Sequence, residues 1–225
     1  MASRSCSDAE VTLLIIAGGN SRRMGDDKLL LPVPPKGIPL VRHVAELLLP
    51  LATKVVVVAN DPDVCAAVRE IGLDDIEREQ DGVQARKLVS CLPDDAPGGG
   101  PLGGLATGLR RLDGWALTVA GDMPFLSAAT CRYLIRRSDS GCDAVVPVLE
   151  GQSQPLHALY SRRCLPAVER ALSAGLRRMD SFWNEVRVRM IPADPLRALD
   201  PDLRTFTNVN TPTEWEEARA LLSQG

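Results

Sequence analysis

Residues 11–19, with the sequence VTLLIIAGG, decide the fold class of this chain. The first seven of them form an apolar and β-branched run in which polar and apolar positions do not alternate. Such a run is typical of a strand buried on both faces, as in a parallel sheet. The two glycines predict a tight turn at the carboxyl end of this strand, and open parallel sheets bind ligands at that edge.

Similar apolar segments recur along the chain and alternate with segments of helical periodicity. The predicted strands lie at 54–60, 115–122, 142–148 and 186–192. The predicted helices lie at 40–52, 63–72, 102–112, 128–137 and 164–175, and a last helix follows the capping box Thr211-Pro212-Thr213-Glu214. Regular alternation of this kind predicts an α/β fold with a Rossmann-like, mostly parallel, doubly wound sheet.

Two segments depart from this alternation. We expect residues 31–39, which hold four prolines, to form a rigid loop, and residues 93–101 to form an irregular segment of proline and glycine. The sequence contains no linker long enough to demand two domains. We therefore expect a flexible N-terminus over residues 1–10 and a single domain over residues 11–225.

The composition excludes several classes of function. The 225 residues carry 26 basic and 29 acidic side chains, a net charge of −3, and 4% aromatic residues. A nucleic-acid-binding domain normally has a basic surface, and a binder of single strands has aromatic platforms for stacking. No uncharged apolar run approaches the length of a bilayer span, and the first residues lack an apolar signal core. We expect a cytoplasmic protein that binds neither nucleic acid nor membrane.

The six cysteines do not form a metal-binding pattern. No two lie closer than eleven positions, and the chain has two histidines, so a zinc site is not expected. An even number of cysteines permits disulfides, but a chain with 45% hydrophobic residues does not need them. We interpret most of the cysteines as small buried apolar side chains.

The loop after the first strand concentrates groups that bind phosphate. Its tandem glycines expose successive backbone N–H groups, and Arg22, Arg23 and Lys28 add positive charge. The spacing is neither GxGxxG nor that of a Walker A loop, which argues against a dinucleotide-dependent dehydrogenase. A basic surface loop without function explains the same residues, so the loop alone does not decide between the two.

This loop is the first of six blocks in order along the chain, which are AGGNSRRMGDDK (17–28), VVVVAN (55–60), GPLGGLATGL (100–109), VAGDMPFL (119–126), QPLHALY (154–160) and FTNVNTPTEW (206–215). Together the six blocks resemble the molybdenum cofactor guanylyltransferases, a family of nucleotidyltransferases. The resemblance implies the fold of nucleotide-diphospho-sugar transferases. It also implies transfer of GMP from GTP to the terminal phosphate of molybdopterin, release of pyrophosphate, and Mg²⁺ as the cofactor.

The resemblance assigns roles to individual residues. Asp122 is implied as the Mg²⁺ ligand, and a carboxylate at a strand's carboxyl end suits this cation, which prefers oxygen ligands. The catalytic residues implied are Asp122, Lys28 and Arg23. The nucleotide-binding residues implied are Ile16, Ala17, Gly18, Gly19, Lys28, Asn60, Asp81, Gly100, Pro101, Leu102 and Asp122.

Each of these residues also has an ordinary structural explanation. Lys28 and Arg23 fit solvated surface charges, and Asp122 fits a turn or helix cap. Asn60 fits a turn cap and Asp81 an ordinary loop aspartate, whereas the small residues of 100–104 fit close helix packing. The order and number of the blocks, rather than any single residue, favour the functional interpretation.

The resemblance places the acceptor near residues 208–212. It implies Asn208 and Asn210 for the acceptor side and makes Asn210 a second candidate for the metal, although its place beside a helix cap also explains an asparagine. We expect residues 154–158 to form a strand edge facing the acceptor, with His157 a core or interface residue. Four arginines suit an anionic pterin phosphate but fit solvated helix faces more simply, namely Arg162, Arg163, Arg177 and Arg178.

Two other functions remain open from the sequence. One is cytidylyl transfer to the same pterin or to a sugar or polyol phosphate, although the second glycine of the first loop favours a purine. The other is a non-catalytic nucleotide-binding protein of the same fold, although Lys28 and Asp122 are both present. The partners implied are GTP, molybdopterin and, transiently, the proteins that deliver and accept the cofactor. We expect a monomer or a weak oligomer.

Overall fold

The computed structural model describes residues 11–18, 28–69, 71 and 88–224. In this part of the chain one large sheet has eight strands: β1 (Val11–Ile16), β4 (Lys54–Val58), β5 (Leu88–Leu92), β6 (Trp115–Ala120), β7 (Ala144–Leu149), β8 (Gln152–Ser153), β9 (His157–Ser161) and β10 (Val188–Pro192). Their order is β10-β7-β9-β6-β1-β4-β5, with β8 paired to β7. Neighbouring strands are parallel except where β8 or β9 is a partner, which confirms the mostly parallel α/β fold.

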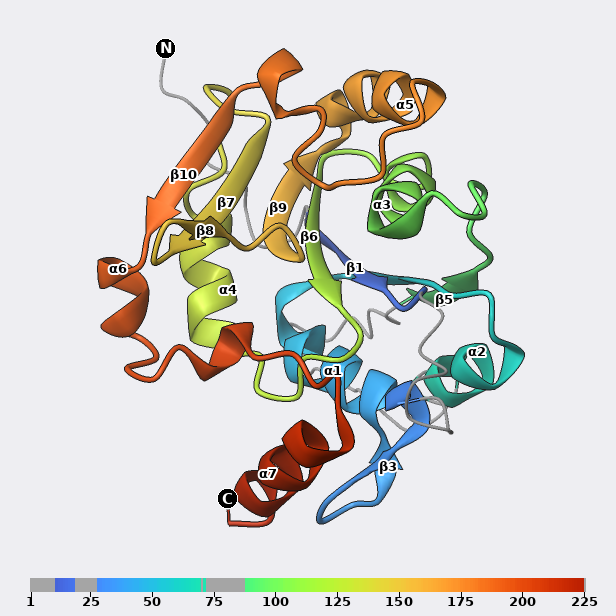
Figure 1. Ribbon diagram of the computed structural model, residues 1–225, viewed down its shortest axis with the longest axis vertical. Helices are drawn as coiled ribbons and strands as arrows, with labels where there is room; N and C mark the ends of the chain where they lie inside the picture. The colour runs from blue at the N-terminus through green and yellow to red at the C-terminus, as the bar shows by residue number, and fades with distance from the viewer. Residues whose placement is uncertain (1–10, 19–27, 70, 72–87, 225) are drawn as a thin grey trace, which may run out of the picture.

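Helices cover both faces of the sheet (Figure 1). They are α1 (Leu40–Leu48), α2 (Pro62–Arg69), α3 (Gly100–Leu109), α4 (Ala128–Ile135), α5 (Leu165–Ser173), α6 (Asp194–Arg197) and α7 (Pro212–Leu222). The buried side chains of α1, α2 and α4 pack in one apolar cluster, and those of α3 and α5 pack in a second. The sheet separates the two clusters, as in a doubly wound fold.

Strand β1 contributes to both clusters. Leu13 and Ile15 pack with α1 and α2, whereas Leu14 and Ile16 pack with α3. All four side chains are buried. Because successive side chains of a strand point to opposite faces, an unbroken apolar run is what a strand covered on both faces requires.

Helix α3 approaches β1 closely because two of its glycines face the strand. A Cβ atom at Gly108 would lie 2.3 Å from a methyl carbon of Leu14, and one at Gly104 would lie 3.0 Å from a methyl carbon of Ile16. Both distances are shorter than van der Waals contact. Packing against the sheet therefore requires the glycines of this helix, as the structural explanation of residues 100–104 proposes.

The structure corrects two expectations about local structure and adds one strand. Strand β9, which begins at His157, lies between β6 and β7 in the interior of the sheet, so residues 154–158 do not form a sheet edge. Residues 31–39 contain a short antiparallel hairpin of β2 (Pro32–Val33) and β3 (Ile38–Pro39) rather than only a loop. Strand β5 is not predicted, because LVSCL is short and carries Ser90 and Cys91 at the sheet's edge, where apolar periodicity is weak.

The cysteines in the described part of the chain fall into two groups, and Cys6 lies outside it. Cys131, Cys142 and Cys164 are buried free thiols, as expected. Cys65 of α2 and Cys91 of β5 instead form a disulfide, which corrects the expectation for this pair. Helix α2 packs on β5. The Cα atoms of Cys65 and Cys91 therefore lie 5.4 Å apart, although 26 positions separate the two residues in the sequence.

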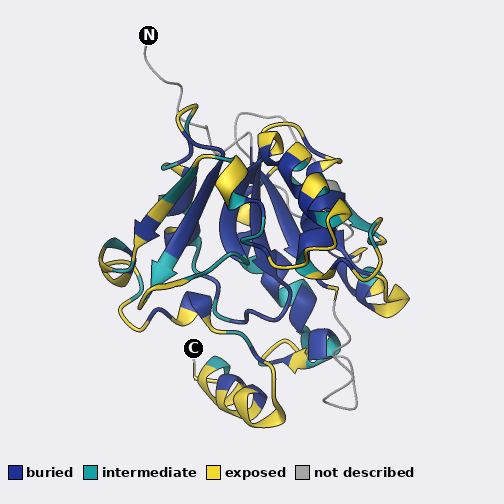
Figure 2. Cartoon of the chain, turned by 45° about the horizontal axis from the view of Figure 1, so that its top comes forward, coloured by how far each residue is buried: buried dark blue, intermediate teal, exposed yellow. Residues whose placement is uncertain are grey.

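Helix α7 buries one narrow side and exposes the rest of its surface (Figure 2). Trp215 and Ala218 are its buried residues. The predicted capping box at its start is confirmed, since Thr211 Oγ1 accepts from the Glu214 N–H at 3.2 Å and Glu214 Oε2 accepts from the Thr211 N–H at 3.0 Å. None of the described helices is long and apolar enough to cross a membrane.

Candidate active site

The carboxyl ends of β1 and β6 lie side by side at one edge of the sheet. The backbone N–H of Gly121 donates to the Ile16 carbonyl at 3.1 Å. Gly121 also lies so close to the end of β1 that a Cβ atom there would be 3.4 Å from the Cβ of Ala17. The sheet thereby places Asp122 beside the start of the loop that follows β1.

Lys28 and Asp122 form a buried ion pair at this edge. Lys28 begins a short 3-10 turn (Lys28–Leu30), and its Nζ contacts Asp122 Oδ2. The exposed fractions of the two side chains are 11% and 13%, so solvent screens the pair weakly. Two residues predicted for catalysis, 94 positions apart in the sequence, thus meet in one contact.

Residues 208–210 close around this ion pair. Asn208 Nδ2 donates to Asp122 Oδ1 at 2.7 Å, and Asn210 Oδ1 accepts from Lys28 Nζ at 3.1 Å. The backbone of Val209 contacts both residues, since its N–H donates to the Asp122 carbonyl at 3.0 Å and its carbonyl accepts from Lys28 Nζ at 3.1 Å. Val209 is a site residue that sequence analysis missed, because a backbone contact leaves no trace in the residue type.

The first turn of α7 fixes this segment in place. Glu214 Oε2 accepts from the Asn210 N–H at 2.6 Å and from the Thr211 N–H at 3.0 Å. These backbone donors, Asn210 first, hold the pKa of the Glu214 carboxyl below its usual value. An ionised carboxylate is also favourable at a helix N-terminus. The capping box therefore orients Asn210 as well as starting the helix.

His157 lies in the core and contacts the segment at Thr205 and Phe206, which leads to the site. Its Nδ1 lies 3.1 Å from the Thr205 carbonyl oxygen, its Nε2 lies 3.3 Å from Cys131 Sγ, and its ring centroid lies 4.5 Å from that of Phe206. Burial lowers the pKa of His157 to about 4, so the ring is neutral at physiological pH. The structure confirms that His157 is a core residue.

Residues implied for nucleotide binding lie at the starts and ends of elements. Gly18 is exposed after β1, and no atom of the described residues lies within 4 Å of the position that its Cβ would take. Gly100 and Pro101 form the accessible first turn of α3, and Gly100 has a φ of +60°, a conformation that favours glycine. Leu102 is fully buried in the core, so only its backbone could contact a nucleotide.

Asn60 makes the turn-capping contact that is its ordinary explanation. Its Oδ1 accepts from the Asp94 N–H at 2.9 Å. Asp94 Oδ1 in turn accepts from the Ala96 N–H at 2.9 Å and from the Thr107 hydroxyl at 3.1 Å. These side chains shape the irregular segment before α3, and a direct role of Asn60 in nucleotide binding stays a prediction.

The arginines considered for the pterin phosphate have partners in the protein. Arg162 pairs with Asp113, Arg163 with Asp143 and Arg178 with Asp180. Arg177 donates from Nε to the Gly98 carbonyl at 2.8 Å, next to the start of α3. Three of the four therefore serve ion pairs in this structure.

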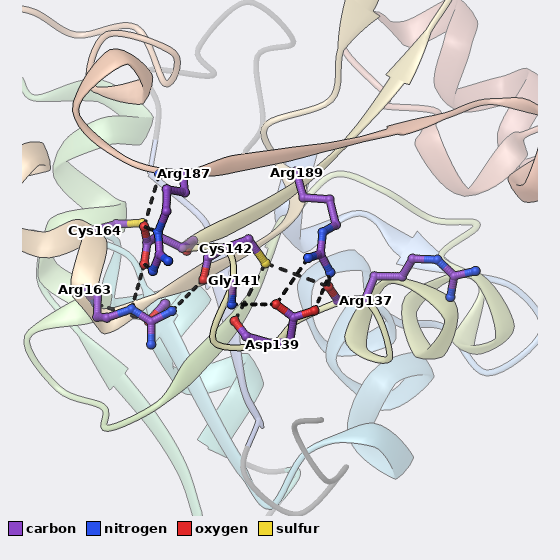
Figure 3. Close-up of polar contacts among 10 residues, drawn as sticks. Arg137, Asp139, Gly141, Cys142, Arg163, Cys164, Arg187 and Arg189 are labelled. Carbon is purple, nitrogen blue, oxygen red and sulfur yellow. Dashed lines mark hydrogen bonds and ion pairs between the residues drawn. The ribbon is translucent and has the colours of Figure 1, made fainter. Parts of the chain in front are cut away.

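A cluster of ion pairs lies at the amino ends of β7 and β10, whereas Asp122 follows the carboxyl end of β6 (Figure 3). Asp143 accepts from Arg163 Nε at 2.6 Å and from Arg187 Nε at 2.9 Å, and Asp139 pairs with Arg189 at 2.8 Å. These donors, Arg187 first, hold the pKa of Asp143 far below its usual value. The cluster ties neighbouring strands together away from Asp122.

Gly19, Arg23 and Asp81 lie outside the described residues, so their roles stay predictions. Among the described residues no group of three or more His, Cys, Asp or Glu side chains could hold a metal ion. Mg²⁺, however, often takes one or two carboxylates and completes its shell with substrate phosphates and water. The single carboxylate of Asp122 therefore fits a Mg²⁺ ion that is bound together with a nucleotide.

The fold and the site together define a nucleotidyltransferase, with a carboxylate and an ammonium group at the carboxyl ends of parallel strands, where Gly18 is exposed after β1. The chain belongs to the MobA-like NTP transferase domain family, whose model matches residues 13–188. It is 35% identical over 213 residues to a probable molybdenum cofactor guanylyltransferase of Pelotomaculum thermopropionicum, with 94% of this chain and 93% of the relative covered. It is 33% identical over 216 residues to a molybdenum cofactor guanylyltransferase of Desulfosudis oleivorans, covering 96% and 97%.

Solved structures show the same fold. Molybdopterin-guanine dinucleotide biosynthesis protein A from Archaeoglobus fulgidus superimposes with a TM-score of 0.74 at 25% identity, over 95% of this chain and all of that one. A 2-C-methyl-D-erythritol 4-phosphate cytidylyltransferase from Thermus thermophilus superimposes with a TM-score of 0.60 at 18% identity, over 95% and 98% of the two chains. The second likeness concerns the fold alone.

Proposed function

We propose that this enzyme transfers GMP from GTP to the terminal phosphate of molybdopterin, as a molybdenum cofactor guanylyltransferase. The convergence of Lys28, Asp122, Asn208 and Asn210 at the carboxyl edge of β1 and β6 is the observation that carries the proposal. The relatives named for this activity are matched over nearly their whole length. The proposal therefore rests on the residues that form the site as well as on the family.

The reaction needs no protein nucleophile. An oxygen of the acceptor phosphate, already ionised at neutral pH, attacks the α-phosphorus of GTP, and the bond to the pyrophosphate oxygen breaks. The protein contributes by binding, orienting and neutralising charge, as in other phosphoryl-group transfers. Lys28 and Arg23 are proposed to bind the triphosphate, and the backbone of residues 16–19 to form its cradle.

Asp122 is the proposed Mg²⁺ ligand, and Asn210 is a second candidate oxygen ligand. When bound, Mg²⁺ neutralises phosphate charge and lowers the cost of the developing negative charge. The amide of Asn208 orients Asp122 by donating to Oδ1, which leaves the lone pairs of Oδ2 directed toward Lys28. Asn208 and Asn210 are also the residues proposed for the acceptor side.

A comparison of Asp122→Asn with wild type tests the proposed site. The substitution keeps the shape of the side chain and removes its charge. Pyrophosphate release with GTP, Mg²⁺ and molybdenum-loaded molybdopterin should fall by about a hundredfold or more, the usual effect of losing a charge-stabilising group. An exposed substitution such as Asp113→Asn serves as the control, since Asp113 is fully exposed beside Arg162. Near-normal turnover by Asp122→Asn would remove Asp122 from the reaction.

The choice of GTP over CTP is tested by calorimetric titration of both nucleotides with Mg²⁺. Gly18 is exposed at the end of β1, and the first turn of α3 presents Gly100 and Pro101, which favours a purine. Binding of GTP at least tenfold tighter than CTP is expected. A preference for CTP would keep the transfer chemistry and change the product to a cytosine dinucleotide.

The cellular setting of the reaction is also proposed. The acceptor is a cofactor passed between proteins, so we infer transient contacts with a protein that delivers molybdopterin and with one that receives the product. A cytoplasmic location and a monomer or weak oligomer fit this role. Sedimentation of the purified chain with and without GTP would measure the oligomeric state directly.

A further inference from the structure

The ammonium group of Lys28 has a full set of acceptors in the described site. It carries three N–H donors. Its Nζ contacts Asp122 Oδ2, and lies 3.1 Å from the Val209 carbonyl and 3.1 Å from Asn210 Oδ1. Three donors thus face three acceptors from two distant parts of the chain.

Each oxygen of the Asp122 carboxylate also has a donor in the described site. Lys28 takes one oxygen, and the Nδ2 group of Asn208 donates to the other at 2.7 Å. Both charged side chains are nearly buried, with exposed fractions of 11% and 13%. The negative charge that would attract a metal ion is therefore already neutralised by a cation of the protein itself.

A divalent cation and the Lys28 ammonium cannot share this position at low cost. Two cations a few ångströms apart repel strongly where solvent screens them weakly. A metal ion at Asp122 therefore requires Lys28 to leave the carboxylate. Leaving is favourable only when another anion accepts the ammonium, because an unpaired buried charge is costly. The polyphosphate of a nucleotide is such an anion.

We propose that Lys28 acts as a charge gate on the metal position of Asp122: it blocks metal binding in the absence of nucleotide and releases the carboxylate when a nucleotide polyphosphate binds the ammonium. The inference rests on the proposed function, which assigns Asp122 to the metal. It adds that metal and nucleotide bind cooperatively through the exchange of partners by one lysine. By linkage, each ligand raises the affinity of the other by the same factor.

Titration of Mn²⁺, a spectroscopic stand-in for Mg²⁺, into the full chain without nucleotide tests the gate. The free Mn²⁺ is measured by electron paramagnetic resonance for wild type and for Lys28→Met, which keeps the side-chain length and removes the charge. Lys28→Met should bind Mn²⁺ alone about tenfold more tightly than wild type, within the usual range for coupled sites. Lys36→Met is the matched control, because Lys36 is exposed and pairs with Glu46 at 3.5 Å.

A second variant removes the same charge with a different side chain. Lys28→Gln replaces the ammonium with a neutral amide, so Mn²⁺ alone should again bind about tenfold more tightly than it does to wild type. Thermal melting of each variant checks that it is folded. If Lys28→Met does not fold, Lys28→Gln carries the test by itself.

The outcomes separate this inference from the proposed function. After subtraction of the Mn²⁺ that GTP binds without protein, tight Mn²⁺ binding by wild type only with GTP, and by Lys28→Met without it, supports the gate. Wild type that binds Mn²⁺ equally well with and without GTP, or variants that bind it no better than wild type, overturn the gate while Asp122 remains the metal ligand. Failure of every protein to bind Mn²⁺ even with GTP overturns the metal site itself.

Discussion

Asp122 and Lys28 hold opposite charges in a place that water reaches poorly, so each depends on the other for stability. Asp122→Ala should lower the free energy of unfolding by about 3 kcal/mol, because it leaves the Lys28 ammonium buried without its counter-charge. Adding Lys28→Met should recover most of that loss, since a neutral pair carries no uncompensated charge. Denaturant unfolding of the wild type, both single variants and the double variant measures the coupling.

The exposed pair of Lys36 and Glu46 provides the control for this double-mutant cycle of Asp122 and Lys28. Its charged atoms lie 3.5 Å apart and 71% of the Lys36 side chain is exposed. Exposed pairs contribute about 0–1 kcal/mol, so the corresponding cycle should show little coupling. If the losses of Lys28→Met and Asp122→Ala simply add, the two charges are not coupled in the folded protein.

His157 should make the stability depend on pH. Its pKa is about 4 in the folded protein against an ordinary value of 6.5, because burial disfavours the charged ring. As the pH falls, the unfolded chain therefore binds a proton first. The neutral His157 ring therefore contributes its full share to the free energy of unfolding above about pH 6.5. This share falls between about pH 6.5 and about pH 4, and a pKa shift of this size makes the total loss about 3 kcal/mol.

Denaturant unfolding at several pH values checks this dependence, with His157→Gln as the comparison. Glutamine does not titrate, so its stability should fall less steeply between pH 6.5 and 4. His43 is half-buried beside the Pro124 carbonyl, and burial lowers its pKa too, so part of the slope should remain in His157→Gln. An unchanged slope would show that the buried ring of His157 does not control it.

At the scale of secondary-structure elements, the contact of α3 with β1 is sensitive to a single methyl group. Alanine normally stabilises a helix interior relative to glycine by about 1 kcal/mol. Gly108→Ala should instead lower the free energy of unfolding by about 1–3 kcal/mol, since its Cβ would lie 2.3 Å from a methyl carbon of the fully buried Leu14. Thermal and denaturant unfolding measure the change.

Two further variants test whether contact with the strand is the cause. Gly104→Ala should cost less than Gly108→Ala, because its Cβ would meet Ile16 at 3.0 Å rather than 2.3 Å. Shortening the neighbour with Leu14→Val should reduce the cost of Gly108→Ala. A gain in stability from Gly108→Ala alone would mean that helix propensity outweighs the contact.

The sequence predicts well those elements whose burial follows from the local pattern of apolar residues. Strand β1 is buried along its whole length and apolar on both faces except at Thr12, and its neighbours β4 and β6 also carry one polar residue each. Strand β9 is also recognised, but its antiparallel place inside the sheet depends on which distant strands it joins. The Cys65–Cys91 disulfide is missed for the same reason, since only the packing of α2 on β5 brings the two residues together.

At the scale of the whole molecule, the candidate site is assembled from separate parts of the chain. The identities of Lys28, Asp122, Asn208 and Asn210 follow from family-like blocks, and the structure shows that they share one network. Their exact contacts could not be predicted, because they depend on how residues 208–210 return across the sheet. The Val209 carbonyl is an extreme case, since any residue type provides one.

The candidate site and the ion-pair cluster around Asp143 lie at opposite ends of the strands. Substitution of Asp143 tests whether the cluster affects stability alone. Asp143 lies at the start of β7, at the edge opposite Asp122, and joins Arg163 and Arg187 (Figure 3). Asp143→Ala should lower the free energy of unfolding by about 1–2 kcal/mol, a modest loss because both arginines are half-exposed and regain water. The kcat/KM for pyrophosphate release should stay within about twofold of wild type, since no contact of the site is removed.

Asp113→Ala is the matched control for this prediction, because Asp113 pairs with Arg162 while fully exposed and should change stability by less than about 0.5 kcal/mol. Lowering the pH should reproduce the effect of Asp143→Ala in the wild type only under strongly acid conditions. Arg187 and Arg163 hold the pKa of Asp143 far below its usual value, so the carboxylate keeps its stabilising charge until the pH falls through that lowered pKa. The opposite result would be an Asp143→Ala variant that loses activity but unfolds at the same denaturant concentration as wild type. That result would show that Asp143 affects the site around Asp122 through the sheet without changing the stability of the protein.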